Sequence, residues 1–285
     1  MKQMLFILIL SVLSTASSFA FFNDQDLQMT CEASTREKPW KFCIYKQLGS
    51  TNQDVLYYFH GAGGSEREYN NLWSIFRDNL RQRKLMMPTV ISFSFGPIWI
   101  LADKNSSPQS GRLPYVIETV FPYMESKVGG LKGQRLLLSR SMGSFNTSQL
   151  LMRFPEKFAR AALACPAITT LSPFATNAEL DAFVKNTPGA DRLKVFGNIR
   201  MQRTFFYTPE EWEKADPLVI GHTLLNENTP PLYISGATQD DYGFYSGGET
   251  FARIATSKRT SDTMWTAHEG GHCALDENAI ARFLF

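Results

Sequence analysis

The sequence carries no strong excess of one charge, and beyond its first twenty residues it has no long apolar run. It holds 29 Lys and Arg against 27 Asp and Glu, a formal net charge of +2 over 285 residues. Because so small a charge creates no long-range field for a polyanion or an acidic lipid surface, nucleic-acid binding is disfavoured. No later run approaches the roughly 20 apolar residues of a membrane span, so none is expected in the mature chain.

Internal repeats, low-complexity tracts and interdomain linkers are missing as well. The composition, 44% hydrophobic and 20% charged, is typical of one large globular domain. We therefore expect a single domain over residues 21–285, and nothing in the sequence indicates its oligomeric state.

The amino terminus has the pattern of a secretory signal. Lys2 precedes an apolar run over residues 4–13, and small polar residues then lead to Ser18-Phe19-Ala20. The run is too short for an uncleaved membrane anchor, and the small-x-small ending is typical of a cleavage site. We predict a signal peptide over residues 1–20, cleavage after Ala20, and a secreted or periplasmic protein.

Cysteine is scarce, and its spacing argues against two uses. Cys31, Cys43, Cys165 and Cys273 fit neither a zinc knuckle nor a CxxC redox motif, so no metal site is expected. An oxidising compartment permits disulfides, and three pairings are possible. The Cys31–Cys43 pair closes a short loop and is favoured, whereas Cys165 and Cys273 form either a second bridge or two buried thiols.

From residue 40 onward, short β-rich runs alternate with longer helical segments, which predicts an α/β fold. Unbroken apolar runs such as Leu136-Leu137-Leu138 are typical of strands covered by helices on both faces. The expected strands are 42–47, 55–59, 90–95, 135–138, 159–165, 232–235 and 264–267. The expected helices contain residues 72–80, 114–127, 141–154 and 275–285.

The segment from residue 167 to 230 interrupts this alternation. It is rich in aromatic residues, and Thr208-Pro209-Glu210-Glu211 has a helix-capping arrangement with Pro at the first helical position. A long insertion in a compact domain usually has a function or a fold of its own. The insertion is either a cap over a site or a set of helices that pads the sheet edge.

A glycine-rich loop follows the strand that ends at Phe59. In His60-Gly61-Ala62-Gly63-Gly64, the glycines permit a sharp turn that leaves backbone N–H groups pointing beyond the strand. Such donors can stabilise an oxyanion, and we expect Ala62 to supply one of them, with Gly63 as the alternative. A plain strand-to-helix turn is the other interpretation. A dinucleotide fingerprint fits less well, because the second spaced glycine is missing.

A second motif follows the strand at 135–138. Ser139-Arg140-Ser141-Met142-Gly143 has the small-x-Ser-x-small spacing of a nucleophile elbow, with Ser139 where glycine is usual. The spacing selects Ser141 as the nucleophile and the N–H of Met142 as an oxyanion donor. A serine that simply caps a helix is the alternative.

A third motif lies toward the carboxyl terminus and supplies an acid and a base. Asp240 follows the strand at 232–235, and His272 follows the last strand behind two glycines. The order Ser, Asp, His is that of α/β-hydrolases, in which a carboxylate-oriented histidine activates the serine. Asp240 is preferred to Asp241, and His272 to His268. Two other histidines have lesser roles: His60 holds the glycine-rich loop by hydrogen bonding, and His222 is an ordinary surface or satisfied histidine.

Together, these motifs resemble those of secreted α/β-hydrolases of the carboxylesterase type, of the esterase D and feruloyl esterase kind. The residues that carry the resemblance over most of the mature chain are 60–64, 139–143, 236–240 and 270–272. The resemblance implies an α/β-hydrolase fold, with a mostly parallel twisted sheet, helices on both faces and a helical insertion between the sixth and seventh core strands of that fold.

The resemblance also implies a serine enzyme that hydrolyses carboxylic esters without a cofactor. The expected substrate is a small-molecule or polymer-linked ester, attacked by Ser141 with His272 and Asp240 in support. Three activities on the same fold are rivals: peptidase, acyltransferase and polyester depolymerase. An exported binding protein without turnover is a rival of another class.

Overall fold

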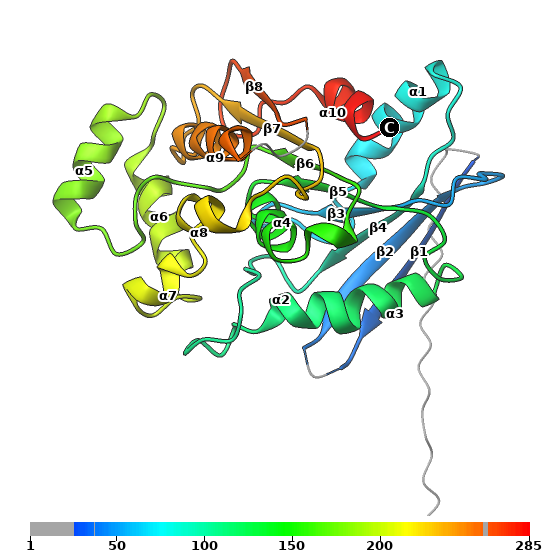
Figure 1. The fold of residues 1–285 in the computed structure, drawn as a ribbon, viewed down its shortest axis with the longest axis horizontal. Coiled ribbons are helices and arrows are strands. Elements are labelled where there is room, and N and C mark those ends of the chain that lie inside the picture. The colour runs from blue at the N-terminus through cyan, green and yellow to red at the C-terminus, as the bar shows by residue number, and fades with distance from the viewer. Residues whose placement is uncertain (1–25, 37, 259–261) are drawn as a thin grey trace, which may run out of the picture.

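Eight strands form one sheet in the computed structural model, which describes residues 26–36, 38–258 and 262–285. The predicted signal peptide lies outside the described residues. Along the sheet the strand order is β1-β2-β4-β3-β5-β6-β7-β8, in which β2 pairs antiparallel with β1 and β4 and all other pairs are parallel (Figure 1). The strands are β1 Leu27–Ser34, β2 Trp40–Gln47, β3 Val55–Phe59, β4 Thr89–Ser94, β5 Arg135–Arg140, β6 Arg160–Ala164, β7 Leu232–Ala237 and β8 Met264–His268.

All seven predicted strands are present, with ends that differ by a few residues. Strand β1 was not predicted, because polar residues such as Gln28 and Glu32 interrupt its short apolar pattern. As the edge strand of the sheet it pairs on one side only, so it needs little apolar surface.

Helices cover both faces of the sheet, and each face has its own hydrophobic core. Alternation along β3 shows the two sides: Tyr57 and Phe59 contribute to one core, and Leu56 and Tyr58 to the other. The second core is closed by α1 Asn70–Gln82 and α10 Glu277–Leu284, which lie together in Figure 1. The first is closed by α2 Arg112–Tyr115, the π-helical turn η1 Val116–Val120, α3 Phe121–Ser126, α4 Met142–Arg153 and α9 Tyr245–Ser257.

Four predicted helices appear, and one that was not predicted, α9, completes the first core. Its first turn contains Gly247 and Gly248, which weaken the sequence signal for a helix. Gly247 nevertheless lets the helix approach the loop after β6 closely, since a Cβ on Gly247 would lie 2.0 Å from the carbonyl oxygen of Ile168. Close packing here outweighs local propensity.

The insertion between β6 and β7 contains four helices with two different attachments. They are α5 Asn177–Asn186, α6 Arg192–Gln202, α7 Pro209–Glu213 and α8 Pro217–Leu224. In the first pair, Leu180, Val195 and Ile199 form a small core with Leu171, separate from both cores of the sheet. In contrast, Trp212 of α7 belongs to the first core of the sheet. The insertion is therefore part extension of the core and part separate helical layer.

Two disulfides join parts of the chain, one between neighbouring strands and one between segments distant in the sequence. Cys31–Cys43 links a directly opposed residue pair on β1 and β2, as favoured from the sequence. Cys165–Cys273 bridges 108 residues of chain, which settles the open alternative in favour of a second bridge. Within the described part of the chain, none of the helices has the length and apolar character needed to cross a membrane.

Candidate active site

Ser141 occupies a sharp turn between β5 and α4. Its backbone has φ 51° and ψ −118°, a region that costs a non-glycine residue about 1–3 kcal/mol and that only surrounding structure can enforce. The Ser141 N–H donates to the carbonyl oxygen of Ala164 at 3.0 Å. Gly143 permits the helix to start against β3, since a Cβ there would lie 2.2 Å from the carbonyl oxygen of Phe59. The turn thus has the shape predicted from the small-x-Ser-x-small spacing.

Serine is tolerated at the first position of this motif because its hydroxyl forms a hydrogen bond. Ser139 is fully buried, and its Oγ donates to the carbonyl oxygen of Ala162 on the neighbouring strand β6 at 3.1 Å. The departure from the usual glycine is therefore accommodated by a hydrogen bond across the sheet.

The loops after β7 and β8 bring a carboxylate and an imidazole to Ser141. His272 Nε2 lies 2.8 Å from Ser141 Oγ, and His272 Nδ1 lies 2.7 Å from Asp240 Oδ2. Asp240 is 1% exposed, and its other oxygen accepts a hydrogen bond from the N–H of Tyr242 at 2.8 Å. The rings of Tyr242 and Phe244 pack against the imidazole, with centroids 4.9 and 5.6 Å away. The imidazole is held by both hydrogen bonds and apolar contact.

The alternative acid and base lie elsewhere. Asp241 forms an ion pair with Lys194 of α6. His268 ends β8, and its Nε2 is buried with no hydrogen-bond partner among the described residues. The exposed His222 lies in the last turn of α8. Of the predicted candidates, the structure joins Ser141, His272 and Asp240 in one hydrogen-bonded line.

The glycine-rich loop presents backbone N–H groups beside Ser141. Ala62 and Met142 both line the cavity there, and within the described chain neither N–H has an intramolecular acceptor. Gly63, the alternative donor, is already engaged, because its N–H donates to the carbonyl oxygen of Pro97 at 2.6 Å. Two adjacent free donors are what an oxyanion requires.

A buried histidine holds this loop in place. His60 Nδ1 lies 2.7 Å from the carbonyl oxygen of Gly61, and Nε2 is 3.2 Å from the indole nitrogen of Trp99 and 2.7 Å from Ser94 Oγ. Since the indole can only donate, Nε2 accepts and Nδ1 carries the proton given to Gly61. Burial lowers the pKa of His60, which favours this neutral form. Ser94 and Trp99 carried no sequence signal for this supporting role.

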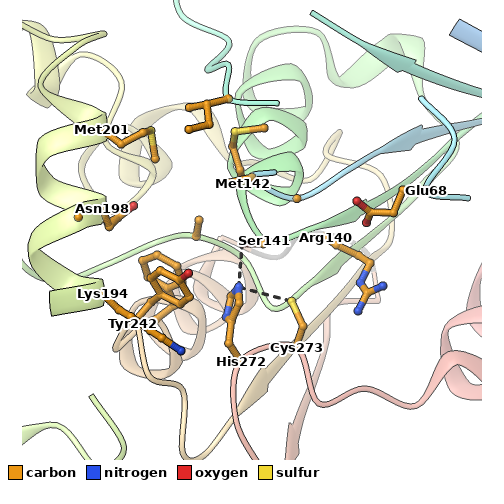
Figure 2. Close-up of a pocket in the computed structure, with 16 residues that line it drawn as sticks. Glu68, Arg140, Ser141, Met142, Lys194, Asn198, Met201, Tyr242, His272 and Cys273 are labelled. Carbon is orange, nitrogen blue, oxygen red and sulfur yellow. Dashed lines mark hydrogen bonds between the residues drawn. The ribbon is translucent and has the colours of Figure 1, made fainter. Parts of the chain in front are cut away.

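A cavity of about 460 Å³ opens above Ser141 and His272 (Figure 2). Glu68 and Arg140 lie at one end, where Glu68 accepts a hydrogen bond from the Tyr58 hydroxyl at 2.6 Å. The opposite side is formed by α6 of the insertion, from Lys194, Gly197, Asn198 and Met201. Neither Glu68 nor the α6 residues belong to a sequence motif, so no pattern indicated them.

One cluster in the described chain has the geometry of a metal site. Ligand atoms of Cys165, His272 and Cys273 lie within 4.8 Å of one another. The two sulfurs are joined in a disulfide, however, and metal ions bind the thiolate form of cysteine. The cluster as it stands does not offer a complete ligand set.

No protein-family model matches the sequence, and the search of curated proteins gives no match either. Solved structures do match: a bacterial brefeldin A esterase, described as a homologue of human hormone sensitive lipase, has a TM-score of 0.63 at 15% identity, covering 93% of this chain and 75% of that one. A ferulic acid esterase has a TM-score of 0.63 at 11% identity, with 91% and 97% covered.

A third match is a hyperthermophilic esterase from the archaeon Pyrobaculum calidifontis, with a TM-score of 0.61, 16% identity, and 89% and 80% of the two chains covered. At such low identity these likenesses are evidence of fold alone. With the strand order, the turn at Ser141 and these three neighbours in view, the chain has the α/β-hydrolase fold of the esterases it resembles.

Proposed function

We propose that this protein is a secreted serine hydrolase that cleaves carboxylic esters through an acyl-enzyme intermediate. One observation carries the proposal: the hydrogen-bonded line Ser141–His272–Asp240, with distances of 2.8 and 2.7 Å, next to two free backbone N–H groups. A serine hydroxyl becomes nucleophilic when a base takes its proton, and a buried carboxylate orients that base.

In the first step, Ser141 Oγ attacks the ester carbonyl while His272 Nε2 removes the hydroxyl proton. The N–H groups of Ala62 and Met142 bind the oxyanion of the tetrahedral intermediate. Asp240 keeps the Nδ1 proton in place and stabilises the imidazolium that forms. His272 then protonates the leaving alcohol, and the acyl group remains on Ser141.

In the second step, water enters the space that the alcohol has left. His272 takes a proton from this water, which attacks the acyl carbonyl, and the same two N–H groups bind the second oxyanion. Collapse of that intermediate returns the proton to Ser141 and releases the acid. Residues of the chain therefore supply the nucleophile, the base, the carboxylate that orients the base and the oxyanion donors.

The cavity and the disulfides support the rest of the proposal. The cavity combines apolar side chains, among them Met142, Met201 and Phe244, with a few polar and charged groups at its ends, which suits a small or polymer-linked ester. Secretion rests on the signal sequence predicted at residues 1–20, and two disulfides are compatible with an oxidising compartment.

Replacement of Ser141 by alanine tests the assignment. We expect Ser141→Ala to lower kcat on a simple aryl ester by about 10⁴-fold or more and to abolish labelling by a fluorophosphonate. Ser148→Ala is the matched control, since that hydroxyl only bonds within α4 to Phe145. Retained turnover in Ser141→Ala would refute the mechanism, and a panel of esters, amides and polyesters would separate esterase from peptidase or depolymerase activity.

A further inference from the structure

A disulfide lies directly beside the proposed catalytic line. Cys273 is the next residue after His272, and its partner Cys165 follows the last residue of β6. Strand β6 ends against the turn of Ser141: the carbonyl oxygen of Ala164 accepts the Ser141 N–H, and the N–H of Ala167 donates to the Ser141 carbonyl at 3.0 Å. The bridge therefore connects the histidine loop to the same structure that holds the nucleophile.

The histidine loop has few other attachments. Glu269, Gly270 and Gly271 are exposed, and Gly270 has φ 120°, a conformation that favours glycine. Backbone contact with the neighbouring loop consists of a hydrogen bond from the Gln239 N–H to the Gly270 carbonyl at 3.0 Å. Because residues 269–271 are exposed, the disulfide at Cys273 adds a covalent attachment directly after the least buried part of the loop.

The bridge also determines the chemical state of the nearest sulfur. Cys273 Sγ lies 3.6 Å from His272 Nε2, the same nitrogen that contacts Ser141 Oγ, and it faces the cavity (Figure 2). A disulfide sulfur has no proton to give. A free Cys273 thiol at this distance would compete with the serine hydroxyl for the imidazole and would form a thiolate–imidazolium pair.

We propose that the Cys165–Cys273 disulfide is a positioning device for His272: it fixes the imidazole between Asp240 and Ser141 and removes a competing thiol from the same nitrogen. This inference rests on the proposed function. A small dithiol would reverse it chemically, by supplying two electrons and two protons to yield two thiols while becoming a cyclic disulfide itself.

Two single variants separate a positioning role from general stabilisation, because both lack the bridge but only one leaves a thiol next to His272. Cys273→Ala should lower kcat for an aryl ester by about 10- to 100-fold, as expected for a displaced base, with KM changed less than about threefold. Cys165→Ala should lose more, and its kcat–pH profile should differ from that of Cys273→Ala. Iodoacetamide should alkylate Cys273 in Cys165→Ala but not in the parent, where the sulfur is in the disulfide.

The other disulfide supplies the matched control. Cys31→Ala/Cys43→Ala removes the bridge between the edge strand β1 and its neighbour β2, and should leave kcat within about twofold of the parent while lowering the thermal midpoint. An equal loss of kcat in this control would overturn the inference, as would parental kcat in Cys273→Ala. Identical pH profiles for Cys165→Ala and Cys273→Ala would exclude the competing thiol.

A readout without turnover keeps the inference apart from the proposed function. The proton between His272 Nδ1 and Asp240 is expected at low field in the NMR spectrum of the parent, and it should broaden or vanish in Cys273→Ala but not in the Cys31/Cys43 control. An unchanged signal would overturn the positioning role. Absence of ester turnover and of serine labelling in the parent would instead count against the proposed function.

Discussion

The floor and the wall of the cavity are built in different ways. The floor consists of Ala62, Ser141, Met142 and His272, which lie at the carboxyl ends of sheet strands and are joined by hydrogen bonds between neighbouring loops. The wall is α6, which packs with α5 around a small core of its own. Met142 in the floor is 1% exposed, whereas Lys194 and Gly197 in the wall are exposed.

This difference indicates a division of labour. A nucleophile, a base and two oxyanion donors act only when their positions are fixed to fractions of an ångström, so they belong on the sheet. Substrate selection needs a surface that can change without loss of the fold, and a helix pair with a separate core provides one. We therefore expect substitutions in the floor to affect kcat and those in the wall to affect KM.

The largest effect should come from Asp240, the proposed acid, which holds His272 of the floor. Asp240→Asn keeps the shape of the side chain but offers an N–H where Nδ1 needs an acceptor, and kcat should fall by about 10³- to 10⁴-fold. Asp241→Asn breaks only the ion pair with Lys194 of the wall, and activity should stay within about threefold. Steady-state kinetics of the two variants measure the contrast. Similar losses of kcat would contradict the distinction between floor and wall.

Gly143, next to the floor, and Gly197, in the wall, make a second pair. Gly143→Ala places a Cβ 2.2 Å from the carbonyl oxygen of Phe59, which should destabilise the fold by about 2–3 kcal/mol and displace Ser141. Gly197→Ala meets no atom within 4 Å, and it should stabilise α6 by up to about 1 kcal/mol. Urea unfolding of both variants measures the contrast, and equal midpoints would contradict it.

Sequence patterns were most informative for the floor, where local rules apply. Apolar runs such as Leu136-Leu137-Leu138 predicted buried strands, and the spacing of small residues pointed to Ser141 and His272, whose Oγ and Nε2 lie 2.8 Å apart. Such local patterns do not predict the wall. The exposed face of α6 and the contact of Glu68 with Tyr58 arise from packing between distant segments, so nothing in their own neighbourhood predicts them.

A larger side chain on the wall should change which substrates bind without changing the catalytic steps. Gly197 lines the cavity with open space beside it, so Gly197→Leu places a side chain where a bulky substrate group would lie. For bulky aryl esters kcat/KM should fall about 10-fold, mainly through KM, because steric differences of a few methylenes are worth 1–3 kcal/mol. The smallest acetate ester is the control, and an equal fall in its kcat would place α6 in the machinery of the floor.

Acidification should act with opposite signs on the loop that supports the floor and on the insertion that carries the wall. In the loop, burial lowers the pKa of His60 below 6.5, so the unfolded chain binds more protons and the His60 contribution to stability is lost as pH falls below 6.5. In the insertion, burial raises the pKa of Asp216 at the start of α8 to about 6, against 3.8 unfolded. Ionised Asp216 therefore costs stability above pH 6, and this cost disappears as pH falls toward 3.8.

Asp216→Asn isolates the effect in the insertion. Asparagine caps a helix as well as aspartate does but carries no charge, so the variant should be more stable than the parent at pH 7, by about 1–2 kcal/mol once partial exposure is allowed for. The gap should shrink between pH 6 and pH 4 and vanish below the unfolded pKa of 3.8. Urea midpoints at pH 7.5, 5.5 and 4 measure it, with His60→Gln as the floor counterpart whose stability should vary less with pH than that of the parent. A stability difference that does not change with pH would mean that Asp216 is no less hydrated in the folded protein than in the unfolded chain.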